Sequence, residues 1–234
     1  MKKRMIPLLT LAALASSPVM ADKDFDATLT NLTNSIYFTP LLMAAHNDTT
    51  YLYQSGMAAS SHLQAMAEGG DISGLSMDLA AVNADVVENP AGGLLAPGAS
   101  TMASFTPLEG NDQFSLVAMM LPTNDGFVGL NSLELPSQPG TYTYYLNAYD
   151  AGTEANDELI VEGGGAPGTP GIPADPSMSS GTAGTGVTNV EHNEYVHIHR
   201  GTLGDADLTA GSSDLSNSVH RWLNPVAKLV ITIK

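Results

Sequence analysis

Two acidic turns follow strand-like segments and have the composition of a cation-binding site. The first, residues 122–125, follows the apolar run 113–121, and the second, residues 150–154, follows the aromatic-rich run 142–148. If both turns lie at the same end of a sandwich, their carboxylates converge there, and Ca²⁺ binds six to eight such hard oxygens in irregular loops. Asp and Gly are also common in ordinary turns, so the pattern alone leaves both interpretations open.

Histidines form a second candidate metal site. His197 and His199 are two residues apart, so on a strand their side chains would lie on the same face. Together with His192 or His46 they would give the nitrogen-rich ligand set that copper or zinc prefers. The alternative is structural, because imidazole nitrogens can also hold a strand end through hydrogen bonds without a metal.

Catalytic motifs are absent from the sequence. It contains no Gly-x-Ser-x-Gly, no cysteine, no His-Glu-x-x-His and no Gly-x-x-x-x-Gly-Lys. Carboxylates are plentiful, but no two of them are distinguished as an acid and base pair. We therefore expect a binding protein and not an enzyme, with a hydrolase of an envelope polymer as the rival hypothesis.

The N-terminus has the three parts of a secretory signal peptide. The charged start Met1–Arg4 precedes the apolar run Met5–Ala15, and Val19 and Ala21 supply the small residues of a cleavage site. The apolar run is too short for a stable membrane-spanning helix. Residues 1–21 are therefore predicted to be a signal peptide, with no membrane span, and the protein to be periplasmic or secreted.

The composition favours a cation as partner and disfavours nucleic acid. The chain carries 24 acidic and 8 basic residues, and removal of Lys2, Lys3 and Arg4 with the signal peptide changes the net charge from −16 to −19. Such a surface repels phosphate backbones and attracts cations, although high acidity also serves solubility alone. Because an exported chain without cysteine has no disulfides, the fold must depend on a hydrophobic core.

The pattern of the chain indicates an all-β fold, an antiparallel β-sandwich formed by residues 22–234. Strand patterns occupy residues 26–40, with a turn near 31–34, and residues 100–105, 113–121, 142–148 and 226–233; short helices are expected at Ser60–Glu68 and Ile72–Val82. Residues 163–186 are rich in Gly and Pro and are predicted to be a flexible loop. Trp222 and the Met119-Met120 pair are expected to pack in the core.

Three sequence blocks resemble the spondin N-terminal domain family, which includes the F-spondin domain of animal extracellular matrix proteins. They are Phe114-Ser-Leu-Val with Pro-x-x-Asp-x-Phe-Val-Gly-Leu130, Tyr149-Asp-Ala-Gly-Thr-Glu154, and Val196-His-Ile-His-Arg-Gly201. The blocks occur in family order, and weaker similarity begins at Thr28. The resemblance implies an eight-stranded antiparallel sandwich similar to C2 domains, with a calcium ion bound by loops at one end.

The resemblance also implies which residues bind the ion and what the module does. Asp125, Asp150 and Glu154 match the family's acidic positions and would be the calcium ligands. The chain departs from the family pattern at Gly126, where a tryptophan is usual, and at Glu154, where aspartate is usual. Adhesion or matrix-type contact with an unidentified protein or glycan is the implied function.

Overall fold

The computed structural model describes residues 24–188, 190 and 193–234. The strands are β1 (Phe25–Asn31), β2 (Tyr37–Phe38), β3 (Leu42–His46), β4 (Asp85–Glu88), β5 (Ser100–Phe105), β6 (Gln113–Leu121), β7 (Gly126–Glu134), β8 (Gly140–Asp150), β9 (His197–Ile198) and β10 (Ala227–Ile233); the helices are α1 (Ser61–Gly69) and α2 (Ser73–Ala81). Eight strands follow the order β4-β3-β6-β7-β8-β10-β1-β5, while β2 pairs with β6 and β9 with β8. All these pairings are antiparallel.

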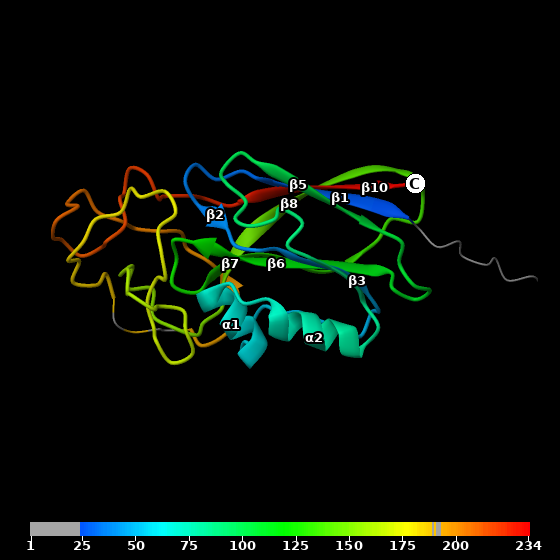
Figure 1. The fold of residues 1–234 in the computed structure, drawn as a ribbon, viewed down its shortest axis with the longest axis horizontal. Coiled ribbons are helices and arrows are strands. Elements are labelled where there is room, and N and C mark those ends of the chain that lie inside the picture. The colour runs from blue at the N-terminus through cyan, green and yellow to red at the C-terminus, as the bar shows by residue number, and fades with distance from the viewer. Residues whose placement is uncertain (1–23, 189, 191–192) are drawn as a thin grey trace, which may run out of the picture.

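The long strand β8 joins the two layers of the sandwich. Its residues 140–146 pair with β10, and its residues 147–150 pair with β7. The layer β5-β1-β10 thus faces the layer β4-β3-β6-β7, as Figure 1 shows. In the core the rings of Phe25 and Phe105 stack with their centroids 4.8 Å apart, and the ring of Phe114 in the opposite layer contacts both edge-on. The predicted all-β antiparallel sandwich is therefore confirmed.

Both predicted helices form, and they cover the outer face of the second layer (Figure 1). The side chain of Ser60 accepts a hydrogen bond from the Leu63 amide at the start of α1, and Gly70 ends the helix in the left-handed conformation. Leu63 and Met66 pack on Met119 of β6, so this strand is buried on both faces. Neither helix described here has the length and apolar character needed to cross a bilayer.

An irregular region follows the sandwich core in the chain and gathers at one end of the molecule. Residues 151–226 contain only the short strand β9 among their described residues, and they form the loops on the left of Figure 1. Within this region Ile172 is buried and bridges to Ile160, so the Gly- and Pro-rich segment 163–186 contacts the rest of the protein. The flexibility of that segment stays a prediction, and the predicted signal peptide, residues 1–21, lies outside the described residues.

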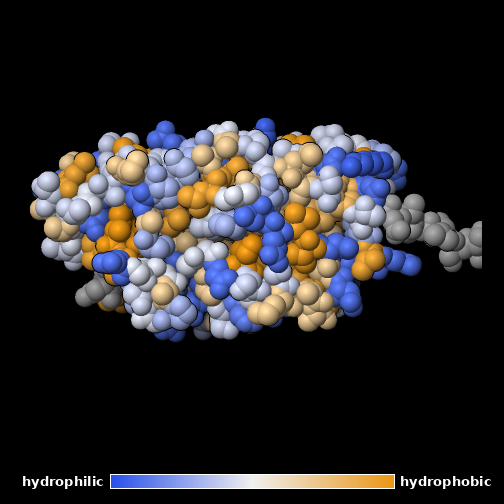
Figure 2. Space-filling model, viewed as in Figure 1, coloured by the Kyte–Doolittle hydropathy of each residue, from blue (hydrophilic) through white to orange (hydrophobic). Residues whose placement is uncertain are grey.

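The exposed surface is chemically mixed. On the face shown in Figure 2, hydrophobic side chains lie in small groups among hydrophilic ones. The predicted core residues are inside: Met119 and Met120 are fully buried, and Trp222 packs in the core between the layers. The predictions for these three side chains are confirmed.

Candidate functional site

Strand pairing brings the two acidic turns together. Asp125 precedes Gly126, the first residue of β7, and Asp150 is the last residue of β8. Gly126 and Asp150 are paired across the two strands, and the Ala151 amide donates a hydrogen bond of 3.2 Å to the Asp125 carbonyl. Asp125 and Asp150 therefore lie side by side at the end of the sheet where the irregular region gathers.

The carboxylate of Asp125 is fully buried, and only one of its two oxygens has hydrogen-bond partners. Its Oδ2 accepts hydrogen bonds from the Thr153 amide at 2.8 Å, the Thr153 hydroxyl at 3.2 Å and the Glu154 amide at 3.4 Å. Its Oδ1 is buried without a hydrogen-bond partner, and the residue is 0% exposed. Burial, and next the negative charge of Asp150, raise the pKa of Asp125 well above its usual value. A buried oxygen in this state requires a donor or a cation.

Asp150 is 2% exposed and is fixed in position by its neighbours. Its Oδ1 accepts from the Gly152 amide at 2.8 Å, and its Oδ2 accepts from the Asn156 side chain at 2.7 Å. His197 Nε2 lies 3.8 Å from the same Oδ2. Asn156, which no sequence pattern singles out, supports Asp150 from within the irregular region.

Glu154 lies next to both Asp125 and a glutamate of helix α1. Its Oε2 accepts from the Gly171 amide at 2.9 Å, while its Oε1 is buried without a hydrogen-bond partner. Burial raises the pKa of Glu154 to about 7; the Gly171 hydrogen bond opposes this rise and the charge of Glu68 adds to it. The Asn124 side-chain amide donates to Asp157 Oδ1 at 2.8 Å, and it lies close enough to Glu154 to oppose the rise in the pKa of that carboxyl.

We expect Glu154→Gln to stabilise the ion-free protein at pH 8 by about 2 kcal/mol and to have little effect at pH 4. The folded protein keeps the Glu154 proton up to about pH 7, whereas the unfolded chain loses it near its ordinary value of 4.5. Wild-type stability therefore falls as pH rises through this window, and glutamine removes that loss. Urea denaturation in chelator at pH 4, 6 and 8 measures the difference. An equal difference between the two proteins at every pH would contradict the assignment.

The two histidines of the predicted nitrogen site have different environments. His197 is partly exposed, and its Nδ1 lies 2.8 Å from the Tyr195 carbonyl, which leaves Nε2 directed to Asp150. His199 is buried and accepts a hydrogen bond from the Gly201 amide on Nδ1, so its proton is on Nε2. Burial lowers the pKa of His199 to about 3. In this tautomer His199 offers no free lone pair to a metal.

The other proposed histidine ligands do not add to this site. Both nitrogens of His46 have contacts, with Ser115 Oγ at 2.7 Å and the Asn47 carbonyl at 2.8 Å. His192 lies outside the described residues. Among residues 24–188, 190 and 193–234, no group of three or more His, Asp or Glu side chains has the arrangement of a metal centre. Transition-metal binding by His197 and His199 stays a prediction.

Close packing requires a glycine at position 126. A Cβ atom at this position would lie 2.7 Å from Thr123 Oγ1 and 3.1 Å from Cδ2 of His199. The His199 ring, whose centroid lies 5.0 Å from that of the Trp222 ring, therefore packs against position 126, where there is no room for a side chain. Thr123 and His199 therefore occupy the space that a side chain at position 126 would need.

Carboxylates also organise the irregular region behind the site. Glu158 is 4% exposed; its Oε1 accepts from the Leu203 amide at 2.6 Å, and its Oε2 accepts from the Gly204 amide at 2.8 Å and the Ser213 hydroxyl at 2.7 Å. Asp214 similarly accepts from the amides of Ile160 and Gly184, each at 2.9 Å. These side chains replace the backbone pairing that strands would provide.

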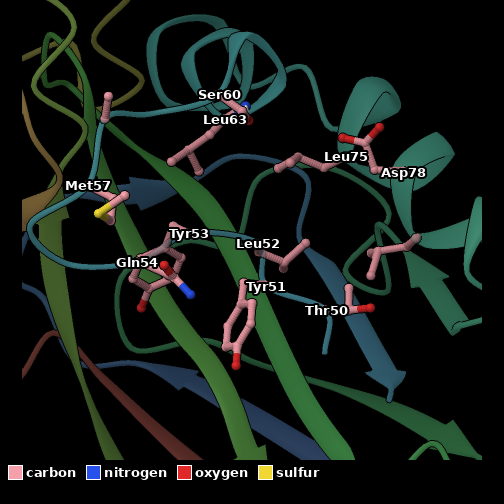
Figure 3. A pocket seen from close by; sticks show the side chains of 12 residues that line it. Thr50, Tyr51, Leu52, Tyr53, Gln54, Met57, Ser60, Leu63, Leu75 and Asp78 are labelled. Carbon is pink, nitrogen blue, oxygen red and sulfur yellow. Dashed lines mark hydrogen bonds between the residues drawn. The ribbon is translucent and has the colours of Figure 1, made fainter. Parts of the chain in front are cut away.

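A separate pocket of about 390 Å³ lies between residues 50–58 and the two helices. Figure 3 shows Leu52, Leu63 and Leu75 directed toward its interior, and Asp78 comes from α2 at its side. The three leucines are buried and belong to the cluster that packs the helices on the sheet. Asp78 is paired with His62 at 2.7 Å. Helix packing explains this pocket, and we assign it no function.

The oxygen atoms at the end of the sheet fit a hard cation better than a transition metal. Asp125 and Asp150 present two buried carboxylates, and Ca²⁺ accepts backbone carbonyls and water as its further ligands. Burial, and next repulsion from Asp150, raise the pKa of Asp125, and a divalent ion would remove that repulsion. The unpartnered Oδ1 of Asp125 supplies a free ligand atom.

Comparison with known families agrees with this geometry. The family described as Spondin_N matches residues 20–158, a range that includes β1 to β8, both helices and both acidic turns. A comparison with curated proteins finds no match to the chain. The family match covers more than half of the 234 residues and confirms the family resemblance; it includes the first two sequence blocks, whereas the block Val196–Gly201 lies outside the matched range. The chain therefore belongs to the spondin N-terminal domain family.

Proposed function

We propose that the protein is an exported, calcium-binding β-sandwich module that acts by binding and not by catalysis. The observation that carries the proposal is Asp125 Oδ1, a buried carboxylate oxygen without a partner next to the buried carboxylate of Asp150. Asp125 and Asp150 would hold the ion, and Glu154 would border it. Backbone carbonyls and water would complete the six to eight oxygen ligands that Ca²⁺ takes.

The ion would act first as a structural element. The turns that carry Asp125 and Asp150 connect the sheet to the irregular region through Thr153 and Asn156. A divalent cation offsets the repulsion between the two carboxylates and holds the turns together. Calcium would thereby order this end of the sandwich.

Family membership makes the protein an extracellular-type module. Export by a signal peptide at residues 1–21, with residence in the periplasm or outside the cell, is part of the proposal. The partner would be a protein or a glycan bound through adhesion or matrix-type contact.

Burial of the aspartates favours a cation over an envelope-polymer substrate. Asp125 and Asp150 are 0% and 2% exposed, so a polysaccharide or peptide chain has no direct approach to either carboxylate. A hydrolase requires its acid and base to reach the scissile bond. This geometry supports a binding role for the carboxylate pair.

A calcium titration of thermal stability tests the proposal. Calcium at about 100 times its Kd should raise the melting temperature of chelator-treated protein by about 5–10 °C, because binding to the folded state adds about 2.7 kcal/mol. Asp125→Asn should lose most of this rise, and Glu109→Gln, a substitution at an exposed carboxylate, should keep it. An equal rise in the Asp125→Asn variant would refute the site, and a zinc-specific rise lost on His197→Ala would favour the histidine alternative.

A further inference from the structure

Strand β5 forms an open edge of the sandwich. It is the last strand of its layer, and among the described strands it pairs with β1 alone. The Asn31 amide donates to the Ala99 carbonyl at 3.0 Å, and this bond continues the register of the β1–β5 ladder. Because hydrogen-bonded and non-hydrogen-bonded pairs alternate in an antiparallel ladder, the odd-numbered residues of β5 carry the bonds to β1. The amides and carbonyls of the even-numbered residues, Ser100, Met102 and Ser104, therefore point away from the sheet.

Nothing in the described part of the chain occupies this edge. The backbone hydrogen bonds of the turns and loops do not involve residues 100–105. The side chains of Ser100 and Ser104 bond to Thr30 and Asp26 of β1, at 2.8 Å and 2.6 Å. The strand contains no proline and no charged residue, and its register with β1 is unbroken. Unpaired amides and carbonyls on such an edge are a template for another strand.

The edge strand of the other layer, β4, is protected from such pairing. It carries the acids Asp85 and Glu88. Asp85 Oδ2 accepts from the Leu108 amide at 2.8 Å and from the Asn111 side chain at 2.7 Å, while the Glu88 carboxylate accepts from the Ser76 hydroxyl of α2. Charges and covering contacts of this kind are how proteins prevent edge pairing. The described residues provide no such protection on β5.

A second copy of the chain fits this edge because β5 is complementary to itself. If two copies of β5 pair antiparallel with Met102 opposite Met102, Ser100 of each copy lies opposite Ser104 of the other. The outward amides and carbonyls of all three residues then have partners. The core faces of both copies also stay on the same side of one continuous sheet. Met102, which is 57% exposed, would be covered by its equivalent.

The charge distribution favours the same pairing. The chain has a net charge of −16, so most contacts between two copies would bring acidic surfaces together. Residues 89–108 contain no Asp, Glu, Lys or Arg, so β5 and its flanking turns add no repulsion. On the adjacent strand β1, Asp26 pairs with Lys234 at 2.8 Å, which offsets its charge. Two copies can therefore approach at β5 without opposing charges of the same sign.

From these observations we propose that the protein forms a symmetric dimer in which β5 of one copy pairs antiparallel with β5 of its partner. The two layers would form one continuous sheet across a two-fold axis, the commonest symmetry of soluble oligomers. The dimer does not depend on the proposed calcium site, because neither Asp125 nor Asp150 lies on β5. For a module that acts by binding, two copies would present two sites and raise avidity.

Sedimentation of the purified protein over a range of concentrations tests the dimer. In chelator and about 0.15 M salt, which screens distant charges, the mass should rise from one chain to two. Met102→Lys places two like charges opposite each other, and Met102→Pro removes an outward amide without breaking a bond to β1. Each should weaken the dimer by about tenfold or more. Met77→Lys, at an exposed methionine of α2, should dimerise as the wild type does.

Hydrogen exchange of single amides locates the contact. In dilute protein the amides of Ser100, Met102 and Ser104 should exchange fast, whereas those of Thr101 and Ala103 should exchange slowly because they bond to β1. At high concentration all five should exchange slowly in the wild type. In Met102→Lys the amides of residues 100, 102 and 104 should stay fast at the same concentration.

Three results would overturn the dimer. The first is the mass of a single chain at every concentration up to about 1 mM, which would leave the edge to a strand of another protein. The second is a dimer that neither Met102 variant weakens, and the third is one that Met77→Lys weakens equally. Circular dichroism verifies that the variants fold; if Met102→Pro does not, Met102→Lys decides. Because all measurements are made in chelator, failure of the dimer leaves the calcium proposal intact.

Discussion

Glu158→Ala is expected to lower the free energy of unfolding by about 3–5 kcal/mol, the largest effect of any single carboxylate in the irregular region. The substitution leaves the amides of Leu203 and Gly204 and the hydroxyl of Ser213 without their acceptor. The Ser213 hydroxyl bond is buried and the two amide bonds are partly buried; a buried donor left unpaired costs about 1–3 kcal/mol, and a partly buried one costs less. The backbone at 158 has a positive φ of 60°, but alanine and glutamate both bear that strain, so it cancels in the comparison.

Urea denaturation and hydrogen exchange measure this effect together. Exchange should accelerate at residues 203–213, which Glu158 holds, and much less in the strands of the sandwich. Glu162→Ala provides the matched control, because Glu162 is exposed and lies four residues away. Equal stability of Glu158→Ala and the control would show that the region is held by other contacts.

Gly152→Ala is expected to destabilise the protein by about 2–4 kcal/mol and to weaken calcium binding. Gly152 has a φ of +68°, and a Cβ there would lie 2.6 Å from the Asn193 carbonyl oxygen and 2.7 Å from the Tyr195 amide nitrogen. These are backbone atoms that cannot rotate away. The turn from Asp150 to Glu154 must therefore shift, and with it the proposed ligands.

The variant Gly163→Ala separates the two costs of Gly152→Ala, the left-handed backbone conformation and the steric clash of the added Cβ. Gly163 has a similar φ of +77°, but nothing lies within 4 Å of its added Cβ. In Gly163→Ala the free energy of unfolding should fall only by the conformational cost of a left-handed alanine, about 1–2 kcal/mol, and the calcium affinity should not change. Equal losses in both variants would mean that the chain at 193–195 does not constrain the acidic turn.

The strands with regular alternation were predictable from sequence. β5 alternates exposed and buried residues throughout, and β1 and β10 alternate buried and half-buried ones, because one face of each meets the core and the other meets solvent. β3 was missed, since all five of its residues are buried between the core and the helix layer and no alternation remains. β7 was missed because Gly126, Gly129 and Asn131 give it the composition of a turn.

The candidate site was predictable only where strands position it. Asp125 and Asp150 meet because β7 pairs with β8, a consequence of sheet topology. Asn156, Glu158 and Glu68 could not be identified, because their contacts depend on the path of an irregular chain that no periodicity encodes. The strand end Asp150 also lies two residues beyond the predicted strand limit, so the aspartate belongs to the sheet itself.

A crystal structure of the protein grown with calcium would show whether an ion lies between the two aspartates. We expect an anomalous difference peak at about 2.3–2.6 Å from Asp125 Oδ1 and from an oxygen of Asp150. A calcium-saturated crystal with no peak between these two carboxylates, or with Asp125 Oδ1 bonded to a protein donor or a water, would contradict it.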